Sequence, residues 1–309
     1  MTAATVAAIG ECMIELSESG SGFSLAFGGD SLNTSVYLAR LGVGVDYVTA
    51  LGDDPYSDAM LAFWQAEGVG TAQVARLAGR LPGLYTIRTD TAGERSFYYW
   101  RSASAAREML QGEAGHRLSQ VLPRYEVLYL TGVSLSILDP ASRGRLLAII
   151  AAARANGARI VFDSNYRPRG WPDVETAYHA IELVYQQTDL ALPSPDDERA
   201  LFGDADAAAV AARLSRWGIP EFVIKDGPRP CLIAWQDRHT GVPAEAVEAA
   251  VDTTAAGDAF NAAYLAARHS GAAPQAAARV AHKLAAAVIQ GRGAVIPLQA
   301  MPAREALGL

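Results

Sequence analysis

Lysine is scarce in this chain of 309 residues: only Lys225 and Lys283 stand among its 26 basic residues, and the others are arginines. Arginine holds carboxylates and phosphates through two parallel hydrogen bonds, which lysine cannot form. With 33 acidic residues the formal net charge is −7, which argues against a dedicated nucleic-acid binder. An anionic substrate stays open, because a cationic pocket can lie inside an acidic protein.

Cysteine is equally rare, and Cys12 and Cys231 lie far apart in the sequence. No C-x-x-C or H-x-x-x-H pattern occurs, which argues against a structural zinc site. Two isolated thiols are typical of buried apolar packing in a reducing cytosol. The N-terminus lacks the basic segment of a signal peptide, and the longest apolar run, residues 146–153, is far shorter than the roughly 20 residues of a membrane span. We expect a soluble, cytoplasmic protein with neither nucleic acid nor a membrane as partner.

Two common nucleotide-binding motifs are also missing. The chain has no Gly-Lys pair, which excludes a Walker A loop, and no G-x-G-x-x-G, which removes the Rossmann dinucleotide fingerprint. A protein of this kind that binds ATP must therefore use another way of holding phosphate.

Short β-rich runs alternate with amphipathic, alanine-rich stretches along the chain. Such alternation predicts an α/β fold with a doubly wound, mostly parallel sheet flanked by helices, in one domain covering residues 1–309. Ligands of such sheets bind beyond the carboxyl ends of the strands. Strands are expected at residues 6–9, 47–51, 126–130, 159–163, 189–192 and 221–225, and helices at 31–41, 55–67, 140–156, 174–187, 207–217, 257–269 and 274–289.

Two segments do not fit this alternation. Residues 23–27 predict a short extra strand, and residues 84–90 and 95–101 predict a hairpin that turns at residues 91–94, where Gly93 suits the turn. They predict a small β layer, or lid, inserted at about residues 14–27 and 83–101, which could cover an active site and exclude water. An ordinary edge hairpin fits the pattern equally well.

The segment 251–260 is the strongest candidate for a phosphate site. Thr253 and Thr254 could cap a helix whose first turn holds only small residues, so that its N–H groups stay open to an anion. Asp258 follows directly, placed to accept a hydroxyl proton. A plain helix start with an acidic first turn is the alternative. The candidate anion hole consists of Ala255, Ala256 and Gly257.

The same segment closely resembles the D-T-x-G-A-G-D motif of the ribokinase-like (PfkB) carbohydrate kinases, with Ala255 in place of the usual glycine. The N-terminal motifs of that family are matched by residues 28–34, 38–42 and 52–54. The resemblance covers essentially the whole chain. It implies a ribokinase-like fold, Asp258 as catalytic base, and ATP with Mg²⁺ as cofactors. It also implies a homo-oligomer joined through the lid, since relatives often pair in that way.

Further segments resemble the branch of the family that phosphorylates O6 of 2-keto-3-deoxygluconate, a six-carbon keto acid; they are residues 9–16, 81–85, 93–101 and 163–169. Other ribokinase-like kinases, such as fructokinases, are the nearest alternative. A non-catalytic sugar or nucleotide sensor on the same fold is another, although a sensor needs no base such as Asp258.

The resemblance implies a substrate pocket with paired arginines for the carboxylate at C1. Arg101 would project from the lid and Arg167 would follow the strand that ends at Asp163, while Tyr85 and Tyr99 would cover the sugar. Each of these could instead be a surface or packing residue. The remaining substrate positions are Gly28, Gly29, Asp30 and Asn33, although the glycines would also suit a turn and the two polar residues a helix cap.

The nucleotide side departs from the family pattern. Ser194 stands where the N-x-x-E motif has asparagine, and either Asp197 or Glu198 could act on Mg²⁺ bound with ATP. The acids would also suit the first turn of a helix. We treat the five histidines as structural, since they show no ligand spacing. The other expected nucleotide positions are Lys225, Gly227, Gly257 and Gly293, with Lys225 among those that shape the adenine site in relatives.

Overall fold

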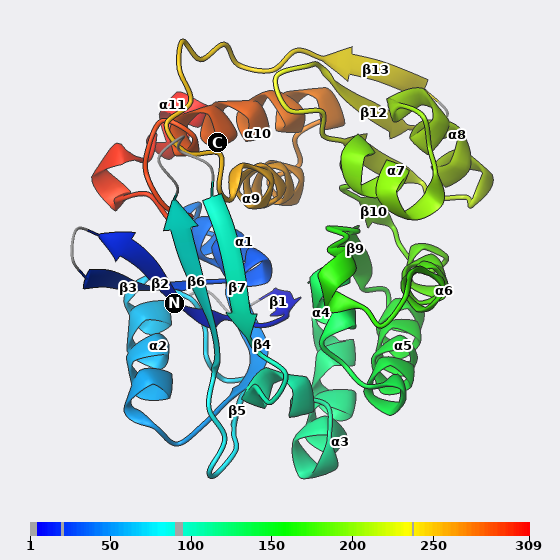
Figure 1. The fold of residues 1–309 in the computed structure, drawn as a ribbon. Helices are drawn as coiled ribbons and strands as arrows, with labels where there is room; N and C mark the ends of the chain where they lie inside the picture. Colours follow the sequence, from blue (N-terminus) through cyan, green and yellow to red (C-terminus); the bar gives the residue numbers. More distant parts are fainter. Residues whose placement is uncertain (1–4, 20–21, 90–94, 237) are drawn as a thin grey trace.

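A nine-stranded sheet forms the centre of the computed structural model, which describes residues 5–19, 22–89, 95–236 and 238–309 (Figure 1). Its order is β13-β12-β11-β10-β9-β8-β1-β4-β5, parallel from β11 to β5 and antiparallel at β12 and β13. The strands are β1 (Val6–Ile9), β4 (Val45–Leu51), β5 (Val74–Arg76), β8 (Val127–Thr131), β9 (Arg159–Asp163), β10 (Leu190–Ala191), β11 (Glu221–Ile224), β12 (Cys231–Trp235) and β13 (Arg238–Val242).

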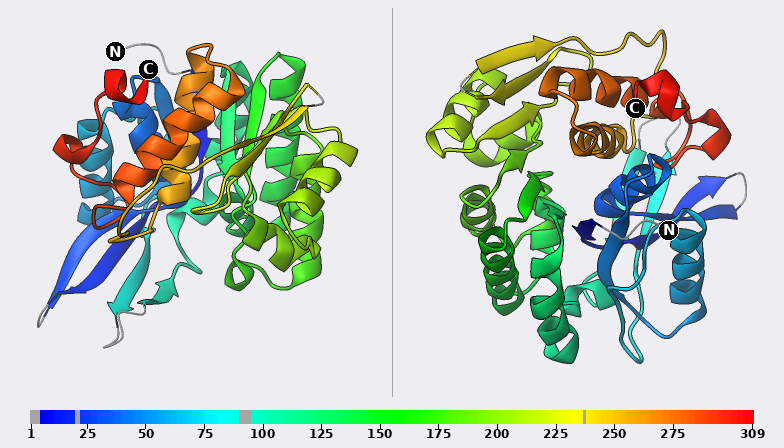
Figure 2. Two further views of the ribbon diagram at one scale, coloured as in Figure 1. Left: turned by 90° about the horizontal axis from the view of Figure 1, so that it is seen from above. Right: turned by 180° about the vertical axis from the view of Figure 1, so that it is seen from behind.

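Helices cover both faces of this sheet, each above its own hydrophobic core (Figures 1 and 2). The predicted α/β class with a mostly parallel sheet is confirmed. One face carries α1 (Asp30–Arg40), α2 (Pro55–Ala66), α9 (Ala256–His269), α10 (Pro274–Val288) and α11 (Arg304–Leu307). The other carries α3 (Gly112–Val121), α4 (Gly132–Ser136), α5 (Pro140–Ala155), α6 (Val174–Tyr185), α7 (Pro195–Phe202) and α8 (Ala207–Arg216).

Local sequence explains where most helices begin. The side chains of Asp54, Asp139, Asp173 and Asp206 accept hydrogen bonds from first-turn N–H groups of α2, α5, α6 and α8. Each predicted strand and helix agrees with the structure to within two residues at either end. The prediction omitted α3, α4, α7, α11, β5, β12 and β13, and it gave no strand for β2 (Met13–Ser19) within the lid segment. Several of these are short, and β13 joins its sheet only through the pairing with β12.

A second, four-stranded sheet projects from this body, as the left view of Figure 2 shows. Its order is β3-β2-β6-β7, and we call it the small sheet. Its strands agree with the predicted lid segments to within one residue at the outer ends, although residues 20–21 and the turn at 91–94, with Gly93, lie outside the described residues. Its strands are β2 (Met13–Ser19), β3 (Gly22–Gly28), β6 (Gly83–Thr89) and β7 (Arg95–Trp100).

Cys12 and Cys231 are free and buried, as expected for apolar packing. Within the described ranges, every helix is too short or too polar to cross a membrane.

Candidate functional site

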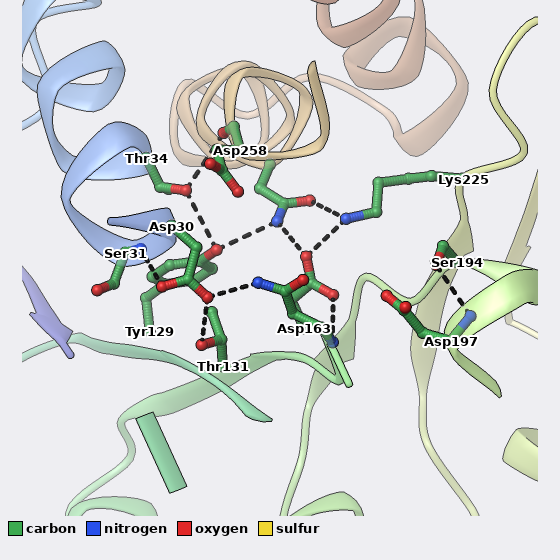
Figure 3. Close-up of polar contacts among 12 residues, drawn as sticks. Asp30, Ser31, Thr34, Tyr129, Thr131, Asp163, Ser194, Asp197, Lys225 and Asp258 are labelled. Atoms are coloured by element: carbon green, nitrogen blue, oxygen red, sulfur yellow. Dashed lines mark hydrogen bonds and ion pairs between the residues drawn. The ribbon is translucent and has the colours of Figure 1, made fainter. Parts of the chain in front are cut away.

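Polar side chains meet where the parallel strands of the main sheet end and the helices α1 and α9 begin (Figure 3). Thr131 and Asp163 are the last residues of β8 and β9, and Lys225 directly follows β11. Asp30 opens α1, and Asp258 lies in the first turn of α9. The topology thus brings together residues that are more than 200 positions apart, at the edge where α/β sheets bind ligands.

The start of α9 differs from the predicted cap. Its N-cap is Ala255, without a side-chain hydrogen bond, so the expected capping by Thr253 or Thr254 is wrong. The Thr254 N–H is instead 3.0 Å from Asp252 Oδ1, and Ala255 then turns the chain with a φ of +61°. This left-handed backbone costs an alanine roughly 1–2 kcal/mol. Glycine, usual at this position of the motif, would adopt it without that cost.

The predicted anion hole lies at this first turn. The Ala256 N–H already has an internal acceptor, Thr253 O at 3.3 Å. Asp258 is half-buried beside it, and its Oδ2 accepts a hydrogen bond of 2.8 Å from Asn33 Nδ2. Burial, together with the negative charges of Asp30 and Asp163, raises the pKa of Asp258 to about 7, although Asn33 and Lys225 act in the opposite direction. A carboxylate with this pKa can both accept and release a proton near neutral pH.

Asp30 is held by internal donors on both oxygens. Its Oδ1 accepts from the Ser31 N–H at 2.7 Å, and its Oδ2 accepts from Thr131 Oγ1 at 2.7 Å and Asn165 Nδ2 at 2.5 Å. Asn165 has a φ of +29° and lies at the start of the loop after β9. Thr131 and Asn165 were not among the site residues predicted from the sequence. Asn165 does lie in the family-like segment 163–169, and this is the signal that could have found it.

Behind Asp258 lies a buried network around Asp163. Asp163 Oδ2 accepts from Lys225 Nζ at 2.6 Å and from Asn261 Nδ2 at 2.7 Å. Lys225 Nζ also donates to Asn261 Oδ1 at 2.9 Å, and Asn261 Nδ2 reaches the Tyr129 hydroxyl at 3.1 Å. Asp163 and Asn261 have no role in the sequence-based site. The signal that could have found Asn261 is its position one helical turn after Asp258.

Gly28 and Gly29 lie at the junction of the small sheet and α1. A Cβ at Gly29 would come within 2.2 Å of Glu11 O, and one at Gly28 within 2.4 Å of the Tyr85 hydroxyl. A side chain at Gly29 would collide with backbone and force the chain to shift, whereas one at Gly28 would collide with the end of a side chain in the same small sheet. Gly29 thus allows α1 to begin close to the backbone of Glu11.

The aromatic and cationic residues of the small sheet are joined to carboxylates. The Tyr85 hydroxyl bonds Glu15, and the Tyr85 ring lies 5.7 Å from that of Tyr99, which is 46% exposed. Arg101 forms an ion pair with the fully buried Glu11, while Arg101 Nε is buried without a hydrogen bond. A buried guanidinium N–H without a partner can donate a hydrogen bond to a further anion.

Arg167 extends from the loop after β9 toward α7. Its Nη1 donates to Asp197 Oδ1 and to the Tyr166 carbonyl, each at 2.8 Å, and its side chain is 58% exposed. Arg101 and Arg167 therefore each have one internal carboxylate partner, Glu11 and Asp197.

Asp197 and Glu198 point in different directions. Glu198 is fully buried, and its two oxygens bond the Tyr185 hydroxyl at 2.6 Å and the Arg213 guanidinium. Asp197 lies at the site, where burial raises the pKa of its carboxyl despite the nearby Arg167. Of the two acids left open by the sequence, only Asp197 has a carboxylate that a ligand could reach.

The other residues expected at the nucleotide site lie around this edge. Ser194 caps α7, with its Oγ 3.4 Å from the Asp197 N–H. Gly293, with a φ of +81°, donates its N–H to Asp252 Oδ2 at 2.9 Å and so joins the late loop to the α9 start. Gly227 has a φ of +57° in the turn after β11, with open space where a Cβ would lie. At both positions it is the left-handed backbone that suits glycine.

Comparison with known proteins gives a consistent result. Residues 3–301 match the model of the pfkB family of carbohydrate kinases. The 2-dehydro-3-deoxygluconokinase of Dickeya dadantii is 48% identical, covering 98% of this chain and 100% of the relative. The enzyme of the same name from Escherichia coli K12 is 46% identical, with 96% and 99% covered.

Solved structures share the fold. A putative ribokinase II from E. coli, in complex with ATP and Mg²⁺, superposes with a TM-score of 0.86 at 22% identity, covering 99% of this chain and 98% of that one. At this identity the likeness shows the fold alone.

Proposed function

The chain belongs to the pfkB family of carbohydrate kinases, and from this membership we propose that it transfers the γ-phosphoryl group of ATP to O6 of 2-keto-3-deoxy-D-gluconate. The near full-length identity of 46–48% to enzymes named for this keto acid favours it over fructose. A non-catalytic sensor is not favoured, since the chain retains the carboxylate that a kinase requires as base.

The observation that carries the chemistry is the position of Asp258 at the first turn of α9. With a pKa raised to about 7, its carboxylate is basic enough to accept the O6 proton. As the proton moves to Asp258, the bond from O6 to phosphorus forms and the bond from phosphorus to the ADP oxygen breaks. The N–H groups of Ala255 and Gly257 would hold the charge of the transferred group, whereas that of Ala256 is bonded to Thr253 O. Positioning and electrostatics supply most of the catalysis in such transfers.

Recognition of the substrate carboxylate falls to Arg101 and Arg167. The buried, unpaired Nε of Arg101 supports this role, as does the exposure of Arg167. Tyr85 and Tyr99 would lie over the sugar as part of the lid. Asp30 and Asn33 would orient hydroxyls, and the bond from Asn33 to Asp258 would hold the first turn of α1 near this carboxylate.

Nucleotide and metal would bind on the α7 side. The described residues contain no group of three or more His, Cys, Asp and Glu side chains that could hold a metal ion. Asp197 fits Mg²⁺ as a single carboxylate ligand, with the other ligands coming from nucleotide phosphates and water. The bound ion would neutralise phosphate charge. Ser194, Gly227 and Gly293 are proposed to line the nucleotide site.

We propose that the protein forms a homo-oligomer through the small sheet. We also propose that it acts in the cytoplasm. Four large side chains on its strands β3 and β7 are each at least 50% exposed; they are Phe23, Leu25, Tyr98 and Trp100. By strand register they lie on one face, opposite Tyr85 and Tyr99. Exposed apolar patches of this kind mark interfaces. Sedimentation of the wild type and of a Trp100→Asp variant would test this, and a wild type that stays monomeric would refute it.

The experiment that tests the reaction is ADP release measured over a panel of substrates. The panel contains 2-keto-3-deoxygluconate, its galactonate epimer, fructose, ribose and a C1-amide of the keto acid. We expect the keto acids to be turned over far faster than the neutral sugars, with ³¹P NMR locating the phosphate on O6. Preference for fructose would overturn the assignment.

A further inference from the structure

We propose that Lys225 is a catalytic residue that contacts the transferred γ-phosphoryl group, and that Asp163 and Asn261 are its positioning residues. This inference rests on the proposed kinase function. It gives Lys225 a role at the reacting phosphate in place of the adenine contact expected from the sequence.

The position of the ammonium group carries the proposal. An ideal Cβ on Gly257 would lie 3.5 Å from Lys225 Nζ, so this group lies against the first turn of α9. That turn contains the proposed anion hole and Asp258. The cation therefore stands at the centre of the proposed chemistry.

Two hydrogen bonds fix the position of the Lys225 ammonium group. Nζ donates to Asp163 Oδ2 at 2.6 Å and to Asn261 Oδ1 at 2.9 Å, and the side chain is only 13% exposed. Asn261 is itself fixed by its bonds to Asp163 and Tyr129. An ammonium group has three N–H donors, and these two acceptors account for two of them. The third donor remains for a ligand oxygen.

The charges around the site explain why a cation is needed there. Asp30, Asp163, Asp197 and Asp258 place four carboxylates at this site. The cations paired with them are Lys225 at Asp163 and Arg167 at Asp197. A nucleotide triphosphate would be repelled by these carboxylates unless a fixed cation met its terminal phosphate. Preorganised donors aimed at developing charge are the largest contribution in such sites.

A purely structural role is the competing explanation, since Lys225 would then only neutralise the buried Asp163. It predicts that loss of Lys225 weakens every nucleotide equally, or only lowers stability. Direct contact with the terminal phosphate predicts a loss confined to nucleotides that carry a γ-phosphate.

The test is calorimetric binding of three probes to the full chain with Mg²⁺: the β,γ-imido analogue of ATP, ADP and adenosine. In Lys225→Met, we expect the affinity for the imido analogue to fall by about tenfold to a hundredfold, since one charge-assisted hydrogen bond is lost. ADP and adenosine should change by less than about threefold, and Lys225→Arg should restore part of the loss because it keeps the charge.

Two further variants keep the result interpretable. Lys225→Met leaves Asp163 buried without its cation and could fail to fold, so the Asp163→Asn/Lys225→Met double variant removes both charges together. Lys283→Met is the matched control, because this other lysine is exposed on α10 and donates to the backbone Ala306 O at 3.3 Å.

A selective loss for the imido analogue in the folded variants supports the proposal. Equal loss for all three probes, or no loss, overturns it. These binding results do not require the keto acid, so failure of the proposed substrate, seen in the turnover panel, would be recognised separately.

Discussion

Replacing Asp258 by asparagine should abolish most activity and at the same time stabilise the fold. Asparagine keeps the size of the side chain and can still accept the hydrogen bond from Asn33, but it cannot take a proton. Loss of a positioned general base typically lowers kcat by ~10²–10⁴-fold. Stability should rise because the native structure no longer holds a partly buried carboxylate beside Asp30 and Asp163.

The magnitude follows from the pKa of Asp258, which rises from 3.8 to about 7 on folding. Since the folded pKa lies above the unfolded one, ionisation destabilises the native state progressively between these two values and by a constant amount above them. A shift of this size corresponds to about 4 kcal/mol at pH 8 and to less than about 2 kcal/mol at pH 5. For a chain of this length, 4 kcal/mol would raise Tm by about 6 °C.

The assay combines chemical denaturation of both proteins at pH 5 and pH 8 with the pH profile of wild-type kcat/KM. Asp196→Asn serves as the control, since Asp196 is exposed on α7, where it pairs with Arg199. The stability gain of Asp258→Asn should be larger at pH 8 than at pH 5, while the control shows no such difference. In the wild type, kcat/KM should rise with a midpoint near 7, because this ratio reports ionisation in the free enzyme.

Either of two results would refute this reasoning. Near-normal turnover by Asp258→Asn would remove Asp258 from the mechanism. A gain in stability that is absent or equal at both pH values would show that Asp258 is not held with a raised pKa.

Two more predictions concern the substrate. Truncation of Arg101 or Arg167 to alanine should cost on the order of 2–5 kcal/mol in kcat/KM for the keto acid. The loss should be much smaller for its C1-amide, because only the acid uses the charge. Equal losses on both substrates would assign these arginines to folding or phosphate binding. If residues 84–101 close over the sugar, the keto acid should slow amide hydrogen exchange in the described parts of this segment, as measured by mass spectrometry. Exchange that is slow without ligand and unchanged by it would show that the segment is a fixed hairpin.

The order of elements could be predicted from the sequence because it depends on local patterns. Alternating β-rich and amphipathic segments placed the strands and helices to within two residues, and the loops at the strand ends indicated the edge where the site lies. The motif from Asp252 to Asp258 likewise predicted the base through its resemblance to the family motif, since a helix start with small residues is a local feature.

Side-chain pairings needed the tertiary structure, because their partners are distant in sequence. Asp197 and Glu198 are adjacent, and only the packing of α7 against Arg213 and Tyr185 buries one and leaves the other at the site. The same holds for Arg101, which follows β7, because its partner Glu11 lies in the connection between β1 and β2.

The raised pKa of Asp258 is also a tertiary property, because it depends on charges brought together from several elements. Asp30 begins α1 and Asp163 ends β9, 228 and 95 positions away, yet both act on this carboxyl. The sequence by itself determined which residue could serve as base and which helix would carry it. The fold alone decided how basic that residue is and where the ammonium of Lys225 lies, because electrostatic interactions depend on distance in space and on burial, neither of which is encoded locally.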